Sequence, residues 1–89
     1  MNPWGQRAMD HWKRHLPDRY AQIEDPVVFF TRLGEEAEAR YEAIRDAELA
    51  GVNPNDGTIG WAEFLDRMRQ ADQKAREIVG TEMIYLPPG

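Results

Sequence analysis

Apolar residues recur at helical spacing in two long segments of the chain, and a segment rich in turn-forming residues separates the two. The apolar positions, which follow one another at steps of three or four residues, are Phe30, Leu33, Ala37, Tyr41 and Ile44 in the first segment and Trp61, Phe64, Met68, Ala71, Ala75 and Ile78 in the second. Such steps place side chains on one face of an α-helix. Between the two segments, residues 51–57 are Gly-Val-Asn-Pro-Asn-Asp-Gly, a composition typical of a turn. The pattern predicts an antiparallel helical hairpin whose apolar faces meet.

Local signals predict where these two helices begin and end. Asp25 followed by proline is typical of a helix start, because the carboxylate caps free amide groups and proline suits the first helical position. We therefore expect one helix over residues 26–50, ended by Gly51. The second is expected over residues 59–82, with Thr58 as its cap.

The N-terminal part of the chain carries signals for a shorter helix. Asn2 followed by proline predicts a helix over residues 3–15, and a short helical turn over 18–23 follows. We expect this helix to pack across the open end of the hairpin, in an all-α fold. The single domain, residues 1–89, then comprises an N-terminal helical segment 1–24, the hairpin 26–82 and an apolar, proline-terminated tail 83–89, in which Ile84 and Leu86 are expected to pack.

The two stripes also predict a register for the hairpin. Folding the chain about Asn55 brings together the pairs Ile44 and Phe64, Tyr41 and Met68, Ala37 and Ala71, and Phe30 and Ile78. The small side chains of Ala37 and Ala71 would permit a close crossing. Gly34 lies in a helix interior, where it costs about 1 kcal/mol relative to alanine, so we expect another helix to approach closely there.

Composition narrows the class of protein. The 89 residues include no cysteine, which excludes disulfides and thiolate metal sites. The net charge is −5, and it is uneven: residues 1–20 carry four cations against two acids, whereas residues 21–89 carry seven against fourteen. An acidic body disfavours direct binding to nucleic acid, because binding to phosphates needs a basic surface. No apolar run approaches the length of a membrane span, so we expect a cytosolic or virion protein without a membrane partner.

Two short motifs resemble metal sites. Asp56 and Glu63 fall where an EF-hand loop has its fifth ligand and its final glutamate, but Val52 and Pro54 occupy the first and third ligand positions without a side-chain oxygen. A polar interhelical loop explains the same residues, and we expect no calcium site. A second motif pairs His11 and His15, four residues apart, but zinc needs three or four ligands. No cofactor is therefore expected.

The usual catalytic patterns are missing from the sequence. It contains no serine and no cysteine, none of its three threonines has a histidine beside it in sequence, and no glycine-rich phosphate loop occurs. The chain is therefore expected not to be an enzyme.

Aromatic residues are numerous for a thin core, which points to protein contacts. The expected interface residues are Trp4, Trp12, Arg19, Tyr20, Phe29, Tyr85 and Leu86, since aromatic residues and arginine concentrate at interfaces. Residues 27–30 are apolar on every side of the expected helix and therefore need a cover, either the N-terminal helix or a partner. Because a hairpin with one short helix leaves apolar surface uncovered, we also expect a homo-oligomer.

Several short segments together resemble a group of viral proteins. They are His11-Trp12, residues 16–20 (Leu-Pro-Asp-Arg-Tyr), Asp25-Pro26 with Phe29-Phe30, residues 33–36 (Leu-Gly-Glu-Glu), residues 75–79 (Ala-Arg-Glu-Ile-Val), and Glu82-Met83 leading into residues 86–88 (Leu-Pro-Pro). Spread over most of the chain, they resemble small, functionally unassigned helical proteins of tailed phages and prophages of actinobacteria. The resemblance implies a phage-encoded helical accessory protein in the host cytoplasm or the virion, and it implies no catalytic or ligand residues.

These observations lead to two expected functions. The first is a non-enzymatic protein-binding module in virion assembly or a structural component of the virion, with a virion or host defence protein as its partner. The alternative is an acidic inhibitor of a host nucleic-acid-binding defence complex, of the anti-CRISPR kind, in which carboxylates take the place of phosphates. The acidic row that would serve it is Glu35, Glu38, Glu42 and Asp46, which Arg32, Arg40 and Arg45 dilute.

Overall fold

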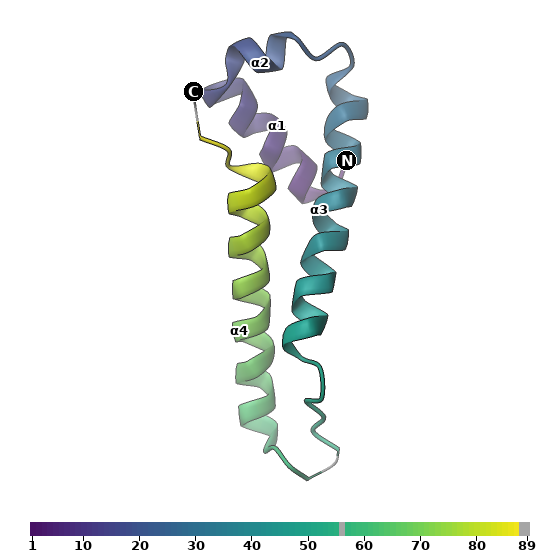
Figure 1. Ribbon diagram of the computed structural model, residues 1–89, viewed down its shortest axis with the longest axis vertical. Helices are drawn as coiled ribbons and strands as arrows, with labels where there is room; N and C mark the ends of the chain where they lie inside the picture. The colour runs from purple at the N-terminus through teal and green to yellow at the C-terminus, as the bar shows by residue number, and fades with distance from the viewer. Residues whose placement is uncertain (56, 88–89) are drawn as a thin grey trace.

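A computed structural model describes residues 1–55 and 57–87, and all regular structure in these residues is helical. The elements are α1 (Pro3–His15), α2 (Pro17–Ala21), α3 (Pro26–Glu48), α4 (Trp61–Val79) and a π-helical turn, η1 (Gly80–Ile84), that continues α4. Figure 1 shows α3 and α4 side by side and antiparallel, with α1 running obliquely behind their upper part and α2 at the top. The expected all-α hairpin with a packed N-terminal helix is confirmed. The molecule is elongated, with extents of 54 × 22 × 15 Å.

The helix starts follow from the two capped prolines. Asn2 Oδ1 accepts a hydrogen bond from Gly5 N at 2.9 Å, and Asp25 Oδ1 accepts one from Val28 N at 3.3 Å. Each cap satisfies an amide that has no partner inside its helix. The predicted start at residue 26 and the predicted bounds 3–15 are therefore confirmed.

The helix ends around the hairpin loop differ from prediction. Helix α3 ends at Glu48, two residues early, and its chain turns through Gly51, whose φ of +80° suits glycine. Helix α4 begins at Trp61 instead of residue 59, because Gly60 is still extended and holds the capping position expected for Thr58. The short second helix occupies Pro17–Ala21 instead of 18–23.

Helices α1 and α3 cross at two buried glycines. A Cβ atom added to Gly34 would lie 2.8 Å from Gly5 N, which is closer than any Cβ can approach. At the same crossing, Asn2 Nδ2 donates a hydrogen bond to Gly34 O at 2.8 Å. The expected close approach at Gly34 is confirmed, and the approaching helix is α1.

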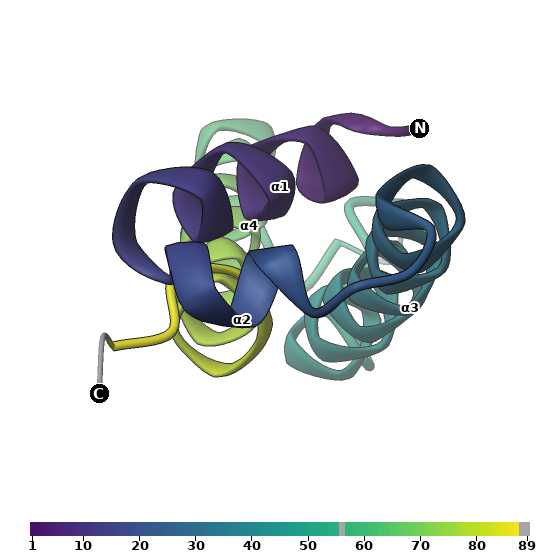
Figure 2. The same cartoon turned by 90° about the horizontal axis from the view of Figure 1, so that it is seen from above.

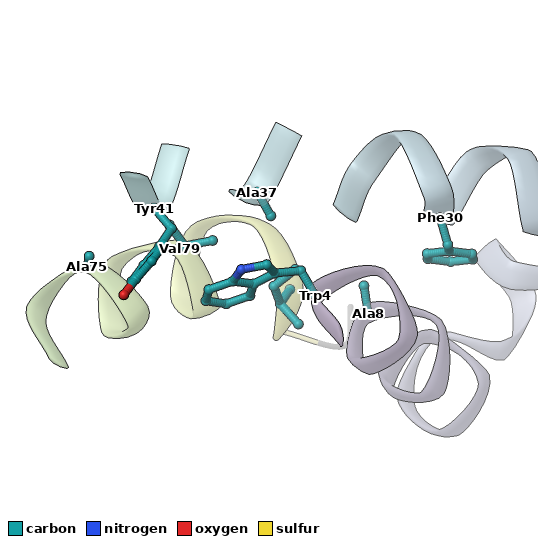
Figure 3. Close-up of a cluster of buried hydrophobic side chains, with 8 residues drawn as sticks. Trp4, Ala8, Phe30, Ala37, Tyr41, Ala75 and Val79 are labelled. Atoms are coloured by element: carbon teal, nitrogen blue, oxygen red, sulfur yellow. The ribbon is translucent and has the colours of Figure 1, made fainter. Parts of the chain in front are cut away.

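The core lies between α1, α3 and the second half of α4. Its buried side chains are Trp4, Ala8, Phe30, Ala37, Tyr41, Ala75, Val79 and Ile84, most of which are labelled in Figure 3. Figure 2, a view from above, shows α1 reaching from the α4 side of the molecule towards α3. Because α1 supplies Trp4 and Ala8, the core is a three-helix contact and not a simple two-helix seam.

The predicted register of the hairpin is wrong. Tyr41 contacts Asp72 and Arg76, not Met68, so α4 is displaced along α3 by one to two turns. Likewise Phe30 packs on aromatic rings of α1 and α2 instead of on Ile78. The reason is that α1 and α2 occupy the space beside the first half of α3, which leaves α4 only the second half.

The displacement also separates the predicted pair of Ala37 and Ala71. Ala37 lies in the core with Ala75 and Val79, whereas Ala71 is buried nearer the start of α4, outside this cluster. Nearby, Lys74 Nζ on α4 reaches Glu48 Oε1 at the end of α3, at 2.6 Å. The tight Ala37–Ala71 crossing is therefore not formed.

The first half of α4 extends beyond the end of α3. Figure 1 shows it running beside the loop formed by residues 49–55 and 57–60. On this half Trp61 is 65% exposed, Leu65 45% and Met68 41%, while Phe64 is half-buried. The expectation that Trp61 and Met68 lie in the seam is therefore wrong.

Candidate protein-binding surface

The start of α3 is apolar on all sides, and the fold covers only one of them. Phe30 is fully buried, with its ring 5.5 Å from that of Trp12 and 6.1 Å from that of Tyr20. The three residues before it remain exposed: Val27 at 63%, Val28 at 48% and Phe29 at 39%. Helices α1 and α2 therefore cover one side of this apolar helix start, and the other side remains exposed to solvent.

A hollow of about 650 Å³ lies beside these residues, where the chain turns from α2 into α3. We call it the corner hollow. Its apolar wall consists of Ile23, Val28, Phe29 and Leu33, and its polar rim of Gln22, Glu24, Asp25, Arg32 and Glu36. An apolar centre within a polar rim is the usual anatomy of a protein–protein interface.

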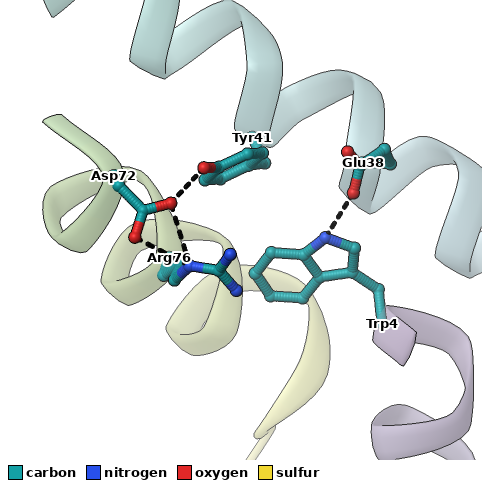
Figure 4. A network of polar contacts seen from close by, with 5 residues as sticks. All are labelled: Trp4, Glu38, Tyr41, Asp72 and Arg76. Atoms are coloured by element: carbon teal, nitrogen blue, oxygen red, sulfur yellow. Dashed lines mark hydrogen bonds and ion pairs between the residues drawn. The ribbon is translucent and has the colours of Figure 1, made fainter. Parts of the chain in front are cut away.

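The predicted interface residues do not form one surface. Trp4 is 6% exposed in the core, and its Nε1 donates to Glu38 Oε2 at 2.7 Å (Figure 4). Its expected role as a surface anchor is corrected to that of a core residue. Trp12 is half-buried against Phe29, with ring centroids 5.4 Å apart, and its buried Nε1 finds no hydrogen-bond partner among residues 1–55 and 57–87.

The other predicted residues lie in two places. Arg19 is exposed on α2, next to the half-buried Tyr20, whose ring lies under Lys13 Nζ at 5.7 Å. In the C-terminal tail, Tyr85 is 51% exposed and Leu86 half-buried. Of the seven predicted residues, only Phe29 lines the corner hollow, and the prediction missed Ile23, Val28 and Leu33. The uniformly apolar run at 27–30 was the signal that pointed towards it.

The histidine pair holds the tail in place. His11 Nε2 donates to Leu86 O at 2.7 Å, and its ring lies edge-on to Tyr85 at 5.5 Å and 4.8 Å from the ring of His15. A nitrogen that donates to a carbonyl has no lone pair for a metal. The expected packing of Ile84 is confirmed, since it is fully buried, whereas the Leu86 side chain is half-buried.

The loop that resembles a calcium site is only partly described. Asp56 lies outside the described residues, and Glu63 Oε1 accepts a hydrogen bond from Arg67 at 3.4 Å. Within the described part of the chain, no three histidine or acidic side chains come together as a metal would require.

The acidic row on α3 is partly used within the molecule. Glu38 is half-buried and binds the Trp4 indole, and Asp46 pairs with Arg45 at 3.2 Å. Glu35 and Glu42 are exposed. The row therefore offers two carboxylates to a partner, with Arg40 on the same helix.

A polar network joins α3 to α4 beside the core (Figure 4). The Tyr41 hydroxyl donates a short hydrogen bond to Asp72, and Arg76 Nε donates to both Asp72 oxygens at 3.0 Å. The hydrogen bond from Tyr41, and then the Arg76 guanidinium, hold the pKa of Asp72 below its usual value. The same hydrogen bond, together with burial, raises the pKa of Tyr41. The network holds the register of α4 against α3.

Comparisons with protein-family models, curated proteins and solved structures find no match to this chain. Among the helices of the described residues, none combines the length and the apolarity that crossing a membrane requires.

Proposed function

We propose that this chain is a non-enzymatic protein-binding module whose partner docks on the corner hollow. The observation that carries the proposal is the exposure of Val27, Val28 and Phe29 beside an apolar hollow with a charged rim. A run of three exposed apolar residues at a helix start is costly to leave in water, and such patches mark interaction sites.

The apolar part of the surface supplies only a share of the binding free energy. Covering three partly exposed side chains of this size contributes about 3 kcal/mol. On the rim, Arg32 makes no ion pair among the described residues, and Asp25 and Glu36 lie beside it. These charges favour a partner that offers an apolar anchor surrounded by groups of both signs.

The resemblance to phage proteins supplies the biological setting of the proposal. In that setting the partner is a virion component or a host protein met during infection, and the chain acts in virion assembly. The alternative, an acidic inhibitor that mimics phosphates, has less support, because Glu38 and Asp46 are engaged within the chain.

Site-specific photocrosslinking tests the proposal. A benzophenone amino acid replaces Val28 in one variant and Gln73, an exposed residue of α4, in a matched control. In bacterial cells that produce virions, we expect a discrete adduct with one virion or host protein from position 28, and its loss when Val27→Asp is added. No adduct at position 28, or equal adducts at both positions, would contradict the proposal.

A further inference from the structure

We propose that the outer face of α1 binds a phosphate group, either as the free ion or as part of a small phosphomonoester. The site is a hollow of about 350 Å³ between this face and the C-terminal tail, which we call the α1 hollow. Its lining residues are Arg7, Asp10, His11, Arg14, His15 and Tyr85. None of them lines the corner hollow, and the proposal does not rest on the proposed function.

Two arginines flank the α1 hollow. Arg7 and Arg14 lie two turns apart on α1, about 10 Å along its axis, with His11 between them. Because both line the same hollow, their guanidinium groups reach it from opposite ends. A guanidinium presents a planar fork of donors that matches two oxygens of a phosphate group. Two such forks around one hollow can therefore hold a single tetrahedral oxyanion.

These two guanidinium groups have no partner inside the molecule. Residues 1–55 and 57–87 offer neither Arg7 nor Arg14 an ion pair or a hydrogen bond, whereas four arginines of α3 and α4 pair with carboxylates. Cations in the last turn of a helix are favoured by its dipole, which accounts for Arg14 and His15. The dipole does not account for Arg7, which lies in the second turn. An external anion gives both arginines a role.

The C-terminal tail completes the α1 hollow with neutral donors. His11 Nε2 donates to Leu86 O at 2.7 Å, and the His11 ring lies edge-on to that of Tyr85 at 5.5 Å. These contacts hold the Tyr85 side chain, 51% exposed, at the wall of the hollow. His15 is exposed there, and even a neutral imidazole has one N–H group to donate. Two charged and two neutral donor groups therefore surround the space.

Size and charge favour a small phosphate ligand over a polyanion. A volume of about 350 Å³ is at the lower end of the range of ligand pockets. An extended nucleic acid would also meet the rest of the chain, where residues 21–89 carry seven cations against fourteen acids. A single carboxylate has only two oxygens and occupies one guanidinium fork, whereas a phosphate group has oxygens for both.

NMR titration of the ¹⁵N-labelled full chain with inorganic phosphate, at an ionic strength held constant with sodium chloride, tests the site. We expect saturable shifts at α1 and at residues 85–86. Arg7→Gln and Arg14→Gln should each weaken binding about tenfold, because each removes one charged fork. The matched control, Arg69→Gln, changes an exposed arginine of α4 that has no ion pair among the described residues, and it should bind like the unsubstituted chain. Circular dichroism checks that all three variants keep their helicity.

A gain of affinity provides the complementary test. Asp10 is the acid that lines the α1 hollow, and it accepts a hydrogen bond from Gln6 Nε2 at 3.2 Å. Asp10→Asn should strengthen phosphate binding about two- to threefold, because a like charge is removed near the anion. Asp66 is the matched control, since it also accepts from a glutamine one turn away, Gln70, but lies on α4. Asp66→Asn should leave the affinity unchanged.

Phenyl phosphate, titrated in the same way, distinguishes the two sources of the phosphate group. Tighter binding than that of inorganic phosphate, lost in Tyr85→Ala, would assign a phosphomonoester whose organic group packs on the tyrosine ring. Equal or weaker binding would assign the free ion. Shifts that do not saturate with either compound, or equal weakening by Arg7→Gln and Arg69→Gln, would overturn the proposal. So would equal effects of Asp10→Asn and Asp66→Asn.

Discussion

Tyr41 combines an aromatic core contact with a hydrogen bond to the ion pair of Asp72 and Arg76. Its ring packs 5.9 Å from that of Trp4, and the guanidinium groups of Arg45 and Arg76 lie 5.3 and 5.2 Å from its centre. The hydroxyl reaches out of the core to Asp72. Tyr41 on α3 therefore contacts both α1 and α4. Removing its side chain should change the register of α4 and lower the stability of the fold.

The pKa shifts of this pair predict how stability depends on pH. The folded-state pKa of Asp72 lies below its ordinary value of 3.8, so its contribution is present above that pH and is lost as the pH falls through the lowered pKa. For Tyr41 the folded pKa lies above 10.0, so its contribution is full below that pH and is lost as the pH rises through the raised pKa. Urea unfolding of the chain and of Tyr41→Phe at several pH values measures both limbs.

We expect Tyr41→Phe to lower the free energy of unfolding by about 1–2 kcal/mol at neutral pH, because one hydrogen bond to a carboxylate is lost. As the pH falls below 4, the variant should lose less stability than the unsubstituted chain loses, since the pKa of its Asp72 returns towards the ordinary value. The matched control is Tyr85→Phe at an exposed ring, which should leave stability unchanged. Equal pH profiles for Tyr41→Phe and the unsubstituted chain would show that the hydrogen bond does not shift Asp72.

Two glycines in helical backbone should respond oppositely to alanine. Gly34→Ala should lower the free energy of unfolding by about 2 kcal/mol or more, because the new methyl group meets Gly5 N and forces α1 away. Gly80→Ala should be neutral or stabilising by up to about 1 kcal/mol, since its Cβ makes an ordinary 3.4 Å contact with the Tyr85 ring. Thermal unfolding of both variants tests the comparison, and a stable Gly34→Ala chain would contradict the crossing of α1 on α3.

At the scale of elements, the N-terminal cap of α1 is also its attachment to α3. The Asn2 side chain accepts from Gly5 N through one atom and donates to Gly34 O through the other. The Asn2 side-chain amide therefore has two roles: it caps the first turn of α1, and it holds this helix at its crossing with α3. At the start of α3, by contrast, the hydrogen bond that the Asp25 side chain accepts from Val28 N caps its own helix and does not attach it to another one.

Exchanging the two caps separates these roles. Asn2→Asp keeps a good capping acceptor but loses the donor to Gly34 O and sets a carboxylate beside that carbonyl, so we expect a loss of about 1–3 kcal/mol. Asp25→Asn keeps its single bond and should cost less than about 0.5 kcal/mol. Chemical denaturation compares the two. Equal effects would mean that the bond from Asn2 to Gly34 contributes nothing to docking of α1.

At the scale of the whole molecule, α1 is the element around which the others pack. It fills the centre of the core with Trp4 and Ala8 and covers Phe30 with Trp12, while the second half of α3 meets the second half of α4. The hairpin predicted as the principal unit is thus held together by a third helix. Exposed apolar residues remain at each end, and the corner hollow is the place where we propose that a partner binds.

Removing residues 1–24 should abolish cooperative unfolding, because Phe30, Ala37 and Val79 then lose the side chains that bury them. Thermal unfolding followed by circular dichroism measures this loss in a chain that starts at residue 25. As a control, Leu65→Glu changes an exposed residue and should retain a cooperative transition at an unchanged midpoint. A cooperative transition in the shortened chain would show that the hairpin folds without α1.

Local chemistry was enough to predict the order of the main helices and where α1 and α3 begin. Asn2 and Asp25, each followed by proline, determine where α1 and α3 begin, because a cap and its proline act within one turn. The spacing of the apolar residues determines which helix faces are buried, and Gly34 indicates that another helix approaches closely there. The run at 27–30 likewise indicated that the start of α3 needs a cover.

Only the tertiary structure decided which face covers which. A stripe that repeats every three or four residues looks alike at every turn, so the stripes of α3 and α4 match in several registers. The choice among them depends on contacts far apart in the chain, Gly5 with Gly34 and Tyr41 with Asp72, and on the space that α1 occupies. For this reason Trp4 is buried although it was expected at the surface, and Trp61 and Met68 are exposed although they were expected in the seam.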